Sequence, residues 1–297
     1  MRLTATTADD GQRLDVFLAE PLGSRARAAR LIEAGAVTVS GKVVVKRHKI
    51  SAGEEIVVDQ PAEPQAPPEV DAPTELVVRF EDDSLLVVDK PAGLVVHPAP
   101  GHAHGTMSQL LSGKAIGGDD EWRAGIVHRL DKNTSGLLVV AKSEAVHRDL
   151  KNALQRRDIH REYLALVDGR PESRSGTIDA PIGRDRRART KISTDTHSPR
   201  EARTHFEIVE ALPRATLLRV TLETGRTHQI RAHLKAIGLP VCGDPDYGRK
   251  DIYGLERQFL HAARLTFQHP VTGVDVDVKS PLPVDLDAAL AEARTAD

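Results

Sequence analysis

The sequence predicts an α+β fold: a large domain on a mostly antiparallel mixed sheet, preceded by a small α+β domain. Three observations lead to this prediction. The chain has 297 residues, which fits one large domain or one ordinary domain with a small one, and its composition of 40% hydrophobic and 28% charged residues is typical of a soluble globular protein. Residues 59–83 hold eight acidic residues, five Pro and one Arg, as an extended linker does. Beyond them, short strand patterns outnumber helices. We therefore expect domains over residues 1–60 and 77–297, joined by a linker over residues 61–76.

The small domain is expected to contain two helices and a small sheet. Apolar residues recur at helical spacing over residues 13–20. A second helix is expected to begin after a Ser24 cap and to end before Gly35, because Gly readily closes a helix. Two short strands around a turn are expected over residues 37–45, and a third over residues 55–58.

The charge is unevenly distributed, although the net charge is only −2. Residues 1–50 hold nine Lys or Arg and five acidic residues. Residues 84–269 hold 29 Lys or Arg and 22 acidic residues. This segregation is typical of a nucleic-acid binder, although chance clustering on solvated faces remains an alternative. The second helix of the small domain places three arginines on its outward face, where they suit phosphate: Arg25, Arg27 and Arg30.

The small domain resembles the RNA-binding module of small-subunit ribosomal protein S-four over residues 11–60. The matching segments are Arg13-Leu14-Asp15, Ser24-Arg25, Leu31-Ile32-Glu33-Ala34-Gly35, Val37 to Lys42 and Gly53-Glu54. The resemblance implies that this domain binds RNA. The alternative is a helical hairpin on a small sheet without a ligand.

In the large domain, strand and helix patterns alternate along the chain. Strands are expected over residues 85–89, 137–141, 160–167, 202–209, 215–222 and 260–267, and helices over residues 144–157 and 228–237. The densest polar segment, residues 125–136, stands directly before the second of these strands. It holds Asp131 and two hydroxyl residues in a loop, where scaffolds often mount reacting groups. From residue types alone, a turn-forming Asp is the commoner interpretation.

The polar segment resembles the signature of the RluA family of pseudouridine synthases. The matching residues are His128-Arg129-Leu130-Asp131 and Thr134-Ser135-Gly136-Leu137-Leu138. Further segments match the family in order: Val88 to Gly93 with His97-Pro98, Arg161 to Val167, Pro181-Ile182-Gly183, Ala202-Arg203-Thr204, Leu222 to Arg231 with His233, Gly243 to Gly248, and Leu260-His261-Ala262. With the S-four-like module, the arrangement is closest to the RluD-like branch, which modifies large-subunit ribosomal RNA.

The resemblance implies the pseudouridine synthase fold and the isomerisation of specific uridines in RNA. Asp131 corresponds to the family's essential aspartate, Tyr163 to its active-site tyrosine and Arg231 to its active-site arginine, which is expected to pair with Asp131. The carboxylate can attack the sugar C1′, attack the ring or take a ribose proton, and we favour the two sugar-centred routes.

Five further residues complete the expected site. Arg129 is expected to prop the gap that a flipped uridine leaves in its stack. Arg226 and Gln229 are candidates for contacts to phosphate or base, with a capped helix start as the alternative. Leu260 and Lys90 are expected to shape the pocket, unless they are scaffold.

The sequence indicates neither a cofactor nor a membrane. It has no Gly-rich phosphate loop, a single Cys242, and a His102 and His104 pair without fixed partners, so neither a nucleotide cofactor nor a metal is expected. No apolar run is long enough to span a bilayer, and no secretory signal begins the chain. We therefore expect a cytoplasmic monomer that acts on RNA, most of all ribosomal RNA, free or in ribosomal particles.

Two other functions remain open at this stage. A non-catalytic RNA-binding or ribosome-assembly factor would keep the scaffold but would not need a buried carboxylate. A hydrolase acting on a nucleoside or glycoside would need a second acid opposite Asp131. No such acid stands in the matched motifs.

Overall fold

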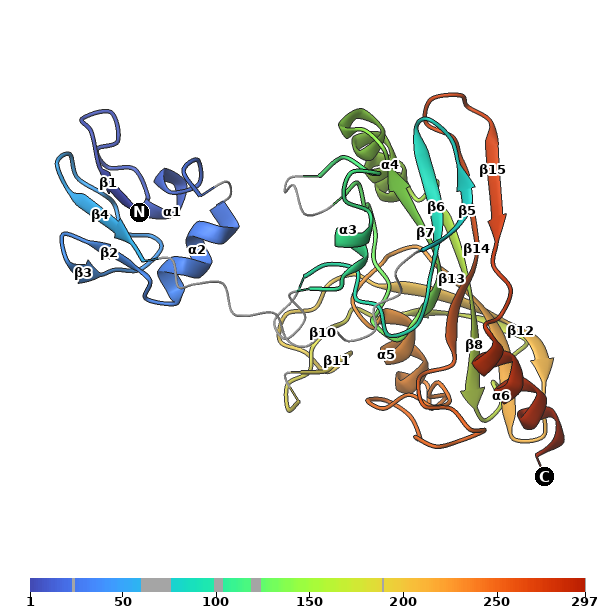
Figure 1. The fold of residues 1–297 in the computed structure, drawn as a ribbon. Coiled ribbons are helices and arrows are strands. Elements are labelled where there is room, and N and C mark those ends of the chain that lie inside the picture. Colours follow the sequence, from blue (N-terminus) through green and yellow to red (C-terminus); the bar gives the residue numbers. More distant parts are fainter. Residues whose placement is uncertain (23–24, 60–75, 99–103, 119–123, 189, 297) are drawn as a thin grey trace. The chain divides into compact units, whose positions relative to one another are not determined.

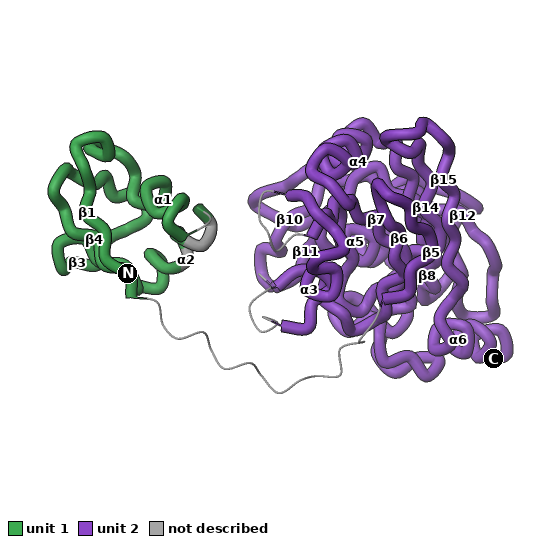
Figure 2. The backbone as a smooth tube through the Cα atoms, turned by 45° about the horizontal axis from the view of Figure 1, so that its top comes forward, with its two compact units in different colours: residues 1–68 green, residues 69–297 purple. Residues whose placement is uncertain are grey.

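The computed structural model describes residues 1–22, 25–59, 76–98, 104–118, 124–188 and 190–296. The chain forms two compact units, residues 1–68 and 69–297 (Figure 2). The expected linker over residues 61–76 lies, except for Leu76, outside the described residues, and so does the expected Ser24 cap.

The first unit is a four-stranded sheet with two helices on it. Its elements are β1 (Arg2–Thr4), α1 (Leu14–Phe17), α2 (Arg25–Glu33), β2 (Val37–Val39), β3 (Lys42–Val43) and β4 (Glu55–Val58). The strand order is β1-β4-β2-β3. The first helix is a single turn, shorter than expected. Leu14 and Leu18 are nevertheless fully buried in the core of this unit.

The second unit is built on one nine-stranded sheet, with order β5-β6-β7-β14-β8-β13-β12-β9 and β15 paired to β14 (Figure 1). The strands are β5 (Val77–Glu81), β6 (Leu85–Lys90), β7 (Ser135–Ala141), β8 (His160–Asp168), β9 (Ser175–Asp179), β12 (Arg203–Ala211), β13 (Ala215–Leu222), β14 (Leu260–Gln268) and β15 (Asp275–Lys279). A separate hairpin pairs β10 (Gly183–Arg184) with β11 (Ile192–Ser193). Of the pairings in the large sheet, only β7 with β14 is parallel, so the expected α+β fold with a mostly antiparallel sheet is confirmed.

Helices cover both faces of the large sheet because its central strands are apolar on both sides. Leu85 and Val87 of β6 share a core with Val146 and Leu150 of α4 (Glu144–Arg156). Their neighbours on the other face of β6 share a second core with three helices: α3 (Met107–Leu110), α5 (Gln229–Ala236) and α6 (Val284–Thr295). Figure 1 shows α4 apart from α5 and α6.

Strand β14 holds the centre of this sheet, between β7 and β8. Its parallel contact with β7 pairs His261 with Ser135 and Ala262 with Gly136. Gly136 has a φ of +112°, and a Cβ there would lie 2.3 Å from the Ala262 carbonyl oxygen. Only glycine therefore fits where the loop that carries Asp131 enters the sheet.

Replacing Gly136 with Ala is expected to lower the free energy of unfolding by about 3 kcal/mol or more, through backbone strain and overpacking together. Urea denaturation measures this loss. Gly169→Ala is the matched control, because Gly169 has a φ of +101° but its Cβ would make only an ordinary 3.5 Å contact with Leu239. Equal losses in the two variants would contradict the close approach to Ala262.

Candidate active site

A cavity of about 810 Å³ opens where the loop before β7, strand β8 and the start of α5 meet. Seven residues predicted from the sequence line it: Arg129, Asp131, Tyr163, Arg226, Gln229, Arg231 and Leu260. They come from segments up to 131 residues apart, between Arg129 and Leu260, and the sheet brings them together. Of the residues predicted in the large domain, Lys90 is the one outside this lining.

The loop that carries Asp131 is held from behind by Lys90. The Lys90 side chain is fully buried, and its Nζ donates to the carbonyl oxygens of Pro91, Leu94 and Lys132, each at 2.9 Å. Burial lowers the pKa of Lys90 to about 7, against the opposing effect of the Asp131 carboxylate. The pocket-wall role expected for Lys90 is therefore corrected: it fastens the loop at residues 90–94 to residue 132.

Strand β14 and the turn before it hold the same loop from another side. Arg257 Nη1 donates to the Asn133 carbonyl oxygen (3.0 Å), and Gln258 Nε2 donates to Thr134 Oγ1 (3.2 Å). Ser135 Oγ and His261 Nδ1 lie 3.0 Å apart. The backbone that follows Asp131 is thus tied at three successive residues.

Arg231 is the charged partner of Asp131. Its Nη1 donates to Asp131 Oδ2 at 3.3 Å. Its other edge donates two hydrogen bonds to Asp244, from Nε to Oδ2 at 2.6 Å and from Nη2 to Oδ1 at 2.8 Å. Nη2 also donates to Asp246 Oδ2 at 2.8 Å. Burial alone would lower the pKa of Arg231, but the hydrogen bonds and charge of Asp244 raise it overall. The guanidinium is therefore a fixed cation with one nitrogen aimed at Asp131.

Tyr163 and Leu260 supply apolar surface to the cavity. Tyr163 lies on β8, paired with Ala262 of β14 and Val220 of β13, and both it and Leu260 are buried. Burial raises the pKa of the Tyr163 phenol, which stays protonated at neutral pH. A flat ring beside an aliphatic side chain suits the face of a nucleobase.

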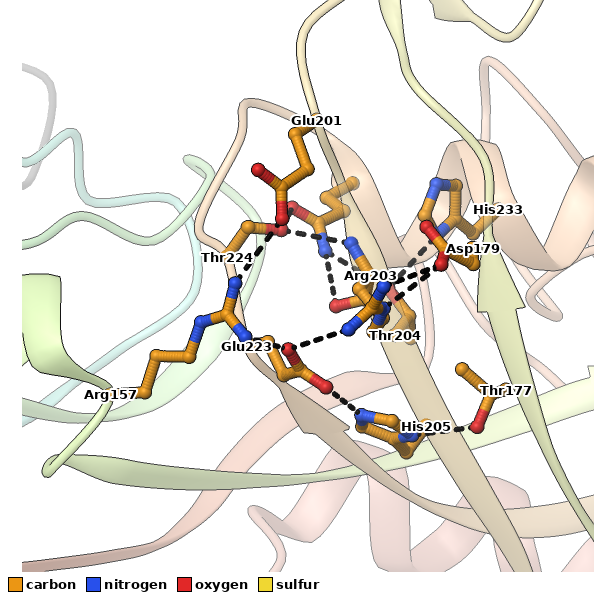
Figure 3. A network of polar contacts seen from close by, with 11 residues as sticks. Arg157, Thr177, Asp179, Glu201, Arg203, Thr204, His205, Glu223, Thr224 and His233 are labelled. Atoms are coloured by element: carbon orange, nitrogen blue, oxygen red, sulfur yellow. Dashed lines mark hydrogen bonds and ion pairs between the residues drawn. The ribbon is translucent and has the colours of Figure 1, made fainter.

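A polar network forms one rim of the cavity (Figure 3). Glu223 accepts hydrogen bonds from Arg157 and Arg203, and its Oε1 lies 2.7 Å from His205 Nε2. Thr224 Oγ1 accepts from the Arg203 backbone N–H at 3.0 Å. These contacts fix the turn that precedes α5.

The amide of Gln229 is fully engaged in this network. Its Oε1 accepts from Thr224 Oγ1 and the Arg226 N–H, and its Nε2 donates to the Arg203 carbonyl and Thr204 Oγ1. The residue is 2% exposed. All its hydrogen-bonding capacity is used within the protein, so the expected contact with RNA is corrected: Gln229 holds the loop that presents Arg226.

The described cavity lining is positively charged overall. It contains three carboxylates, those of Asp131, Glu201 and Glu223. It contains six Lys or Arg side chains: Arg129, Lys151, Arg157, Arg161, Arg226 and Arg231. Arg129 and Arg226 are exposed, and Arg226 Nε donates to the Glu201 carbonyl oxygen at 3.2 Å. Such a lining attracts a polyanion.

A second cleft of about 720 Å³ adjoins the first and shares residues 225–227 with it. The β10–β11 hairpin forms one wall. Three further arginines line it and are exposed: Arg184, Arg186 and Arg200. Arg184, Arg186 and Arg200 therefore continue the positive surface of the active-site cavity.

In the first unit, Arg25 is not free of partners. Its Nε donates to Asp15 Oδ2 at 3.0 Å, and Arg13 donates to both oxygens of that buried carboxylate. The Arg25 side chain remains 58% exposed. The side chains of Arg27 and Arg30 lie outside the part of the structure that is described.

Sequence reasoning assigned no role to four residues around Asp131. Asp244, Asp246 and Tyr247 stand in the segment matched at residues 243–248, and His228 stands between Thr227 and Gln229. The pairing of Asp244 with Arg231, 13 residues earlier, could not be inferred from spacing. The signal available was the density of ionisable residues in a short loop after a helix.

Neither a metal cluster nor a membrane helix appears among the described residues. No group of three or more His, Cys, Asp or Glu there could hold a metal ion, and His102 lies outside the described ranges. No helix in the described ranges is both long and apolar enough to cross a membrane. Cys242 is buried, and burial raises the pKa of its thiol to about 12.

Comparison with known proteins identifies two family matches and close relatives. The RNA pseudouridylate synthase family matches residues 84–236, and the S4 domain family matches residues 12–56. The RNA pseudouridine synthase YlyB of Bacillus subtilis is 42% identical, over 98% of this chain and 97% of that protein. Ribosomal large subunit pseudouridine synthase D of Nitrosomonas europaea is 44% identical, over 96% of this chain and 85% of that protein.

A solved structure shares the fold of the large unit. Human RNA pseudouridylate synthase domain containing 1 superimposes with a TM-score of 0.59 at 27% identity, over 74% of this chain and 90% of that one. These matches span both units and the segments that build the cavity. The chain therefore belongs to the RNA pseudouridylate synthase family, as an RluA-type enzyme with an N-terminal S4 domain that isomerises uridine in RNA.

Proposed function

We propose that this enzyme converts specific uridines of large-subunit ribosomal RNA to pseudouridine, with Asp131 as the catalytic carboxylate. The observation that carries the proposal is the position of Asp131 in a cationic cavity, 3.3 Å from a buried arginine that Asp244 locks in place. The S4 domain and the ribosomal large subunit enzymes among the relatives support this choice of RNA.

The reaction breaks the N1–C1′ bond and forms a C5–C1′ bond. C5 loses its proton and N1 gains one, so atoms and electrons balance without a redox partner. Asp131 divides this exchange into easier steps, as nucleophile at C1′ or as base at the ribose. Arg231 holds the carboxylate in place, and Tyr163 offers its ring to the face of the base.

A uridine in structured RNA must leave its stack to reach Asp131, at a cost of a few kcal/mol. Arg129, two residues before Asp131, is exposed at the cavity. We propose that the Arg129 side chain fills the gap that the flipped uridine leaves in the RNA stack. Arg226, also exposed in the lining of this cavity, is assigned to a phosphate.

The lining disfavours the alternative of a hydrolase with two acids. Apart from Asp131, the carboxylates in the described lining are Glu201 and Glu223, and both pair with Arg157 at the rim. Neither is available as an unpaired acid opposite Asp131.

Carbodiimide mapping of pseudouridine in total RNA tests the proposal. Cells with the wild-type protein, with the Asp131→Asn protein and with neither are compared. Sites in large-subunit ribosomal RNA should appear with the wild type alone. Sites restricted to transfer RNA would contradict the proposed substrate, and sites that persist with Asp131→Asn would contradict the proposed catalytic group.

Removing residues 1–60 is expected to weaken modification of ribosomal RNA more than it disturbs the fold, because the second unit has its own core. Modification rates on ribosomal particles and the unfolding temperature of the remaining unit measure the two effects. An unchanged rate and site pattern would show that the S4 domain does not contribute to recognition.

Replacing Arg184 and Arg200 together with Gln is expected to weaken RNA binding about tenfold, and to reduce the slope of log K against log salt by about 1 to 2. Titrations with labelled RNA at several salt concentrations measure both. Arg264→Gln is the control, since Arg264 lies on β14 outside both clefts, paired with Asp277. If all variants show the same slope, the second cleft does not hold phosphates.

A further inference from the structure

His228 is a side chain of the cavity that the mechanism above does not use. It precedes α5 with φ 53° and ψ 18°, a left-handed conformation that costs a non-glycine residue about 1 kcal/mol or more. Its Nε2 lies 4.0 Å from Asp131 Oδ2, and its ring lines the cavity. The strained backbone thus places an imidazole beside the catalytic carboxylate.

The other nitrogen of this imidazole, Nδ1, is hydrogen-bonded to the Tyr247 hydroxyl. The Ile192 backbone N–H donates to the Tyr247 hydroxyl oxygen at 2.9 Å, and that hydroxyl lies 3.1 Å from His228 Nδ1. The hydroxyl oxygen accepts a hydrogen bond from the Ile192 N–H, and the hydroxyl group can donate its own hydrogen bond to His228 Nδ1. The alternative tautomer would leave the Tyr247 proton without an acceptor among the described residues.

This chain of donors fixes which nitrogen of His228 carries the proton. With Nδ1 as an acceptor, the neutral imidazole has its N–H on Nε2, facing Asp131. Burial lowers the pKa of His228 despite the nearby carboxylate of Asp131, which favours that neutral form. Arg231 and His228 then both face Asp131 Oδ2, so Oδ1 is the oxygen left for the reaction.

The Tyr247 ring supports Arg231 as well. The Arg231 guanidinium carbon lies 5.0 Å from the ring centroid, and the His228 ring meets the Tyr247 ring edge-on at 5.8 Å. One side chain thus contacts both groups that face Oδ2.

We propose that His228 and Tyr247 are positioning residues of this enzyme, which act together with Arg231 to hold Asp131 Oδ2 and present Oδ1 to the ribose. This inference rests on the proposed role of Asp131. It adds to that role a fixed tautomer of His228 and an orienting hydroxyl on Tyr247.

Nitrogen NMR of protein with ¹⁵N-labelled histidine tests the tautomer without any activity. The His228 signals are identified by their loss in His228→Gly, a change that suits the left-handed backbone. The wild type should show the proton on Nε2, and Tyr247→Phe should abolish that preference. A wild-type proton on Nδ1, or a preference unchanged in Tyr247→Phe, would overturn the inference.

Steady-state kinetics on ribosomal RNA test the consequence. His228→Gly and Tyr247→Phe should each lower kcat about 10- to 100-fold, less than the loss of a direct hydrogen-bond donor, with KM changed less than about twofold. Tyr253→Phe, at a buried tyrosine outside the cavity, is the control and should retain wild-type kcat. Unchanged kcat in Tyr247→Phe would overturn the inference, even if His228→Gly failed to fold.

The two tests separate this inference from the proposed function. If the wild type forms no pseudouridine in ribosomal RNA, the proposed substrate is wrong, while the NMR result still decides whether Tyr247 sets the His228 tautomer. If the wild type is active and the tautomer is the other one, the positioning role is wrong and the function stands.

Discussion

Asp131→Asn is expected to lower kcat on ribosomal RNA by at least about 10⁴-fold while the affinity for RNA stays within about twofold. Asn has nearly the shape of Asp, so the contact with Arg231 at Asp131 Oδ2 can persist as a neutral hydrogen bond. What disappears is the anionic oxygen to which we assign the reaction. Single-turnover kinetics with saturating enzyme isolate the chemical step, and filter binding measures affinity.

The decisive comparison for this variant is with a rim carboxylate. Glu201→Gln removes a negative charge from the same cavity but changes only a partly exposed pair with Arg157. It should retain most of the wild-type rate. If the two variants lost similar activity, the effect would be one of cavity charge, and Asp131 would not be the reacting group.

Asp244→Asn is expected to destabilise the protein by about 3 to 5 kcal/mol, and to reduce kcat about 100-fold. The Asp244 side chain is fully buried and the Arg231 side chain is 4% exposed, so the substitution leaves a buried cation without its bidentate partner. Asp244 Oδ1 also accepts from the N–H groups of Asp246 and Tyr247, which adds to the loss. Chemical denaturation and single-turnover kinetics measure the two effects.

Asp246→Asn provides the matched control for Asp244. Asp246 binds the same guanidinium nitrogen at the same 2.8 Å, but its side chain is 44% exposed. Water can replace it, so a cost of about 0 to 1 kcal/mol is expected. A larger loss in Asp246→Asn than in Asp244→Asn would show that the buried fork does not anchor Arg231.

The sequence predicts the centre of the large sheet closely. The six expected strands and two expected helices begin and end within two residues of the observed ones, because these elements combine strong apolar patterns with clear turns. Strands β5, β9 and β15 of this sheet were missed. Strands β5 and β9 each lie at an edge of the sheet and leave most of their side chains in solvent, so the alternating apolar pattern is weak. Strand β15 is short, and only two of its side chains, Val276 and Val278, are buried.

Helix α6 was missed for a different reason. Its buried stripe is Leu286, Ala289, Leu290 and Ala293, which has helical spacing but relies on small residues among acidic ones. The contact that makes it a stable helix is tertiary, against the second core of the sheet. The spacing of apolar residues within the helix does not reveal this packing against the sheet.

The cavity lining could be predicted because motifs identify residue types at fixed places. The roles of Lys90 and Gln229 could not, since they depend on where every polar atom finds a partner. The Nζ of Lys90 is directed at carbonyl oxygens behind the loop, and the amide of Gln229 forms its hydrogen bonds within the turn before α5. Polar residues inside a motif can thus serve the backbone as well as the substrate.

The position of β14 between β7 and β8 sets the order in which the active site can be completed during synthesis. Asp131, Tyr163 and Arg231 are all translated before residues 260–268, yet β14 is the strand that separates the loop of Asp131 from the strand of Tyr163. A growing chain can therefore contain all three proposed catalytic side chains before the sheet sets their spacing. At about 5 to 20 residues per second, this interval lasts a few seconds. During it, the proposed catalytic residues are present in the chain but are not yet held in the arrangement that the completed sheet gives them.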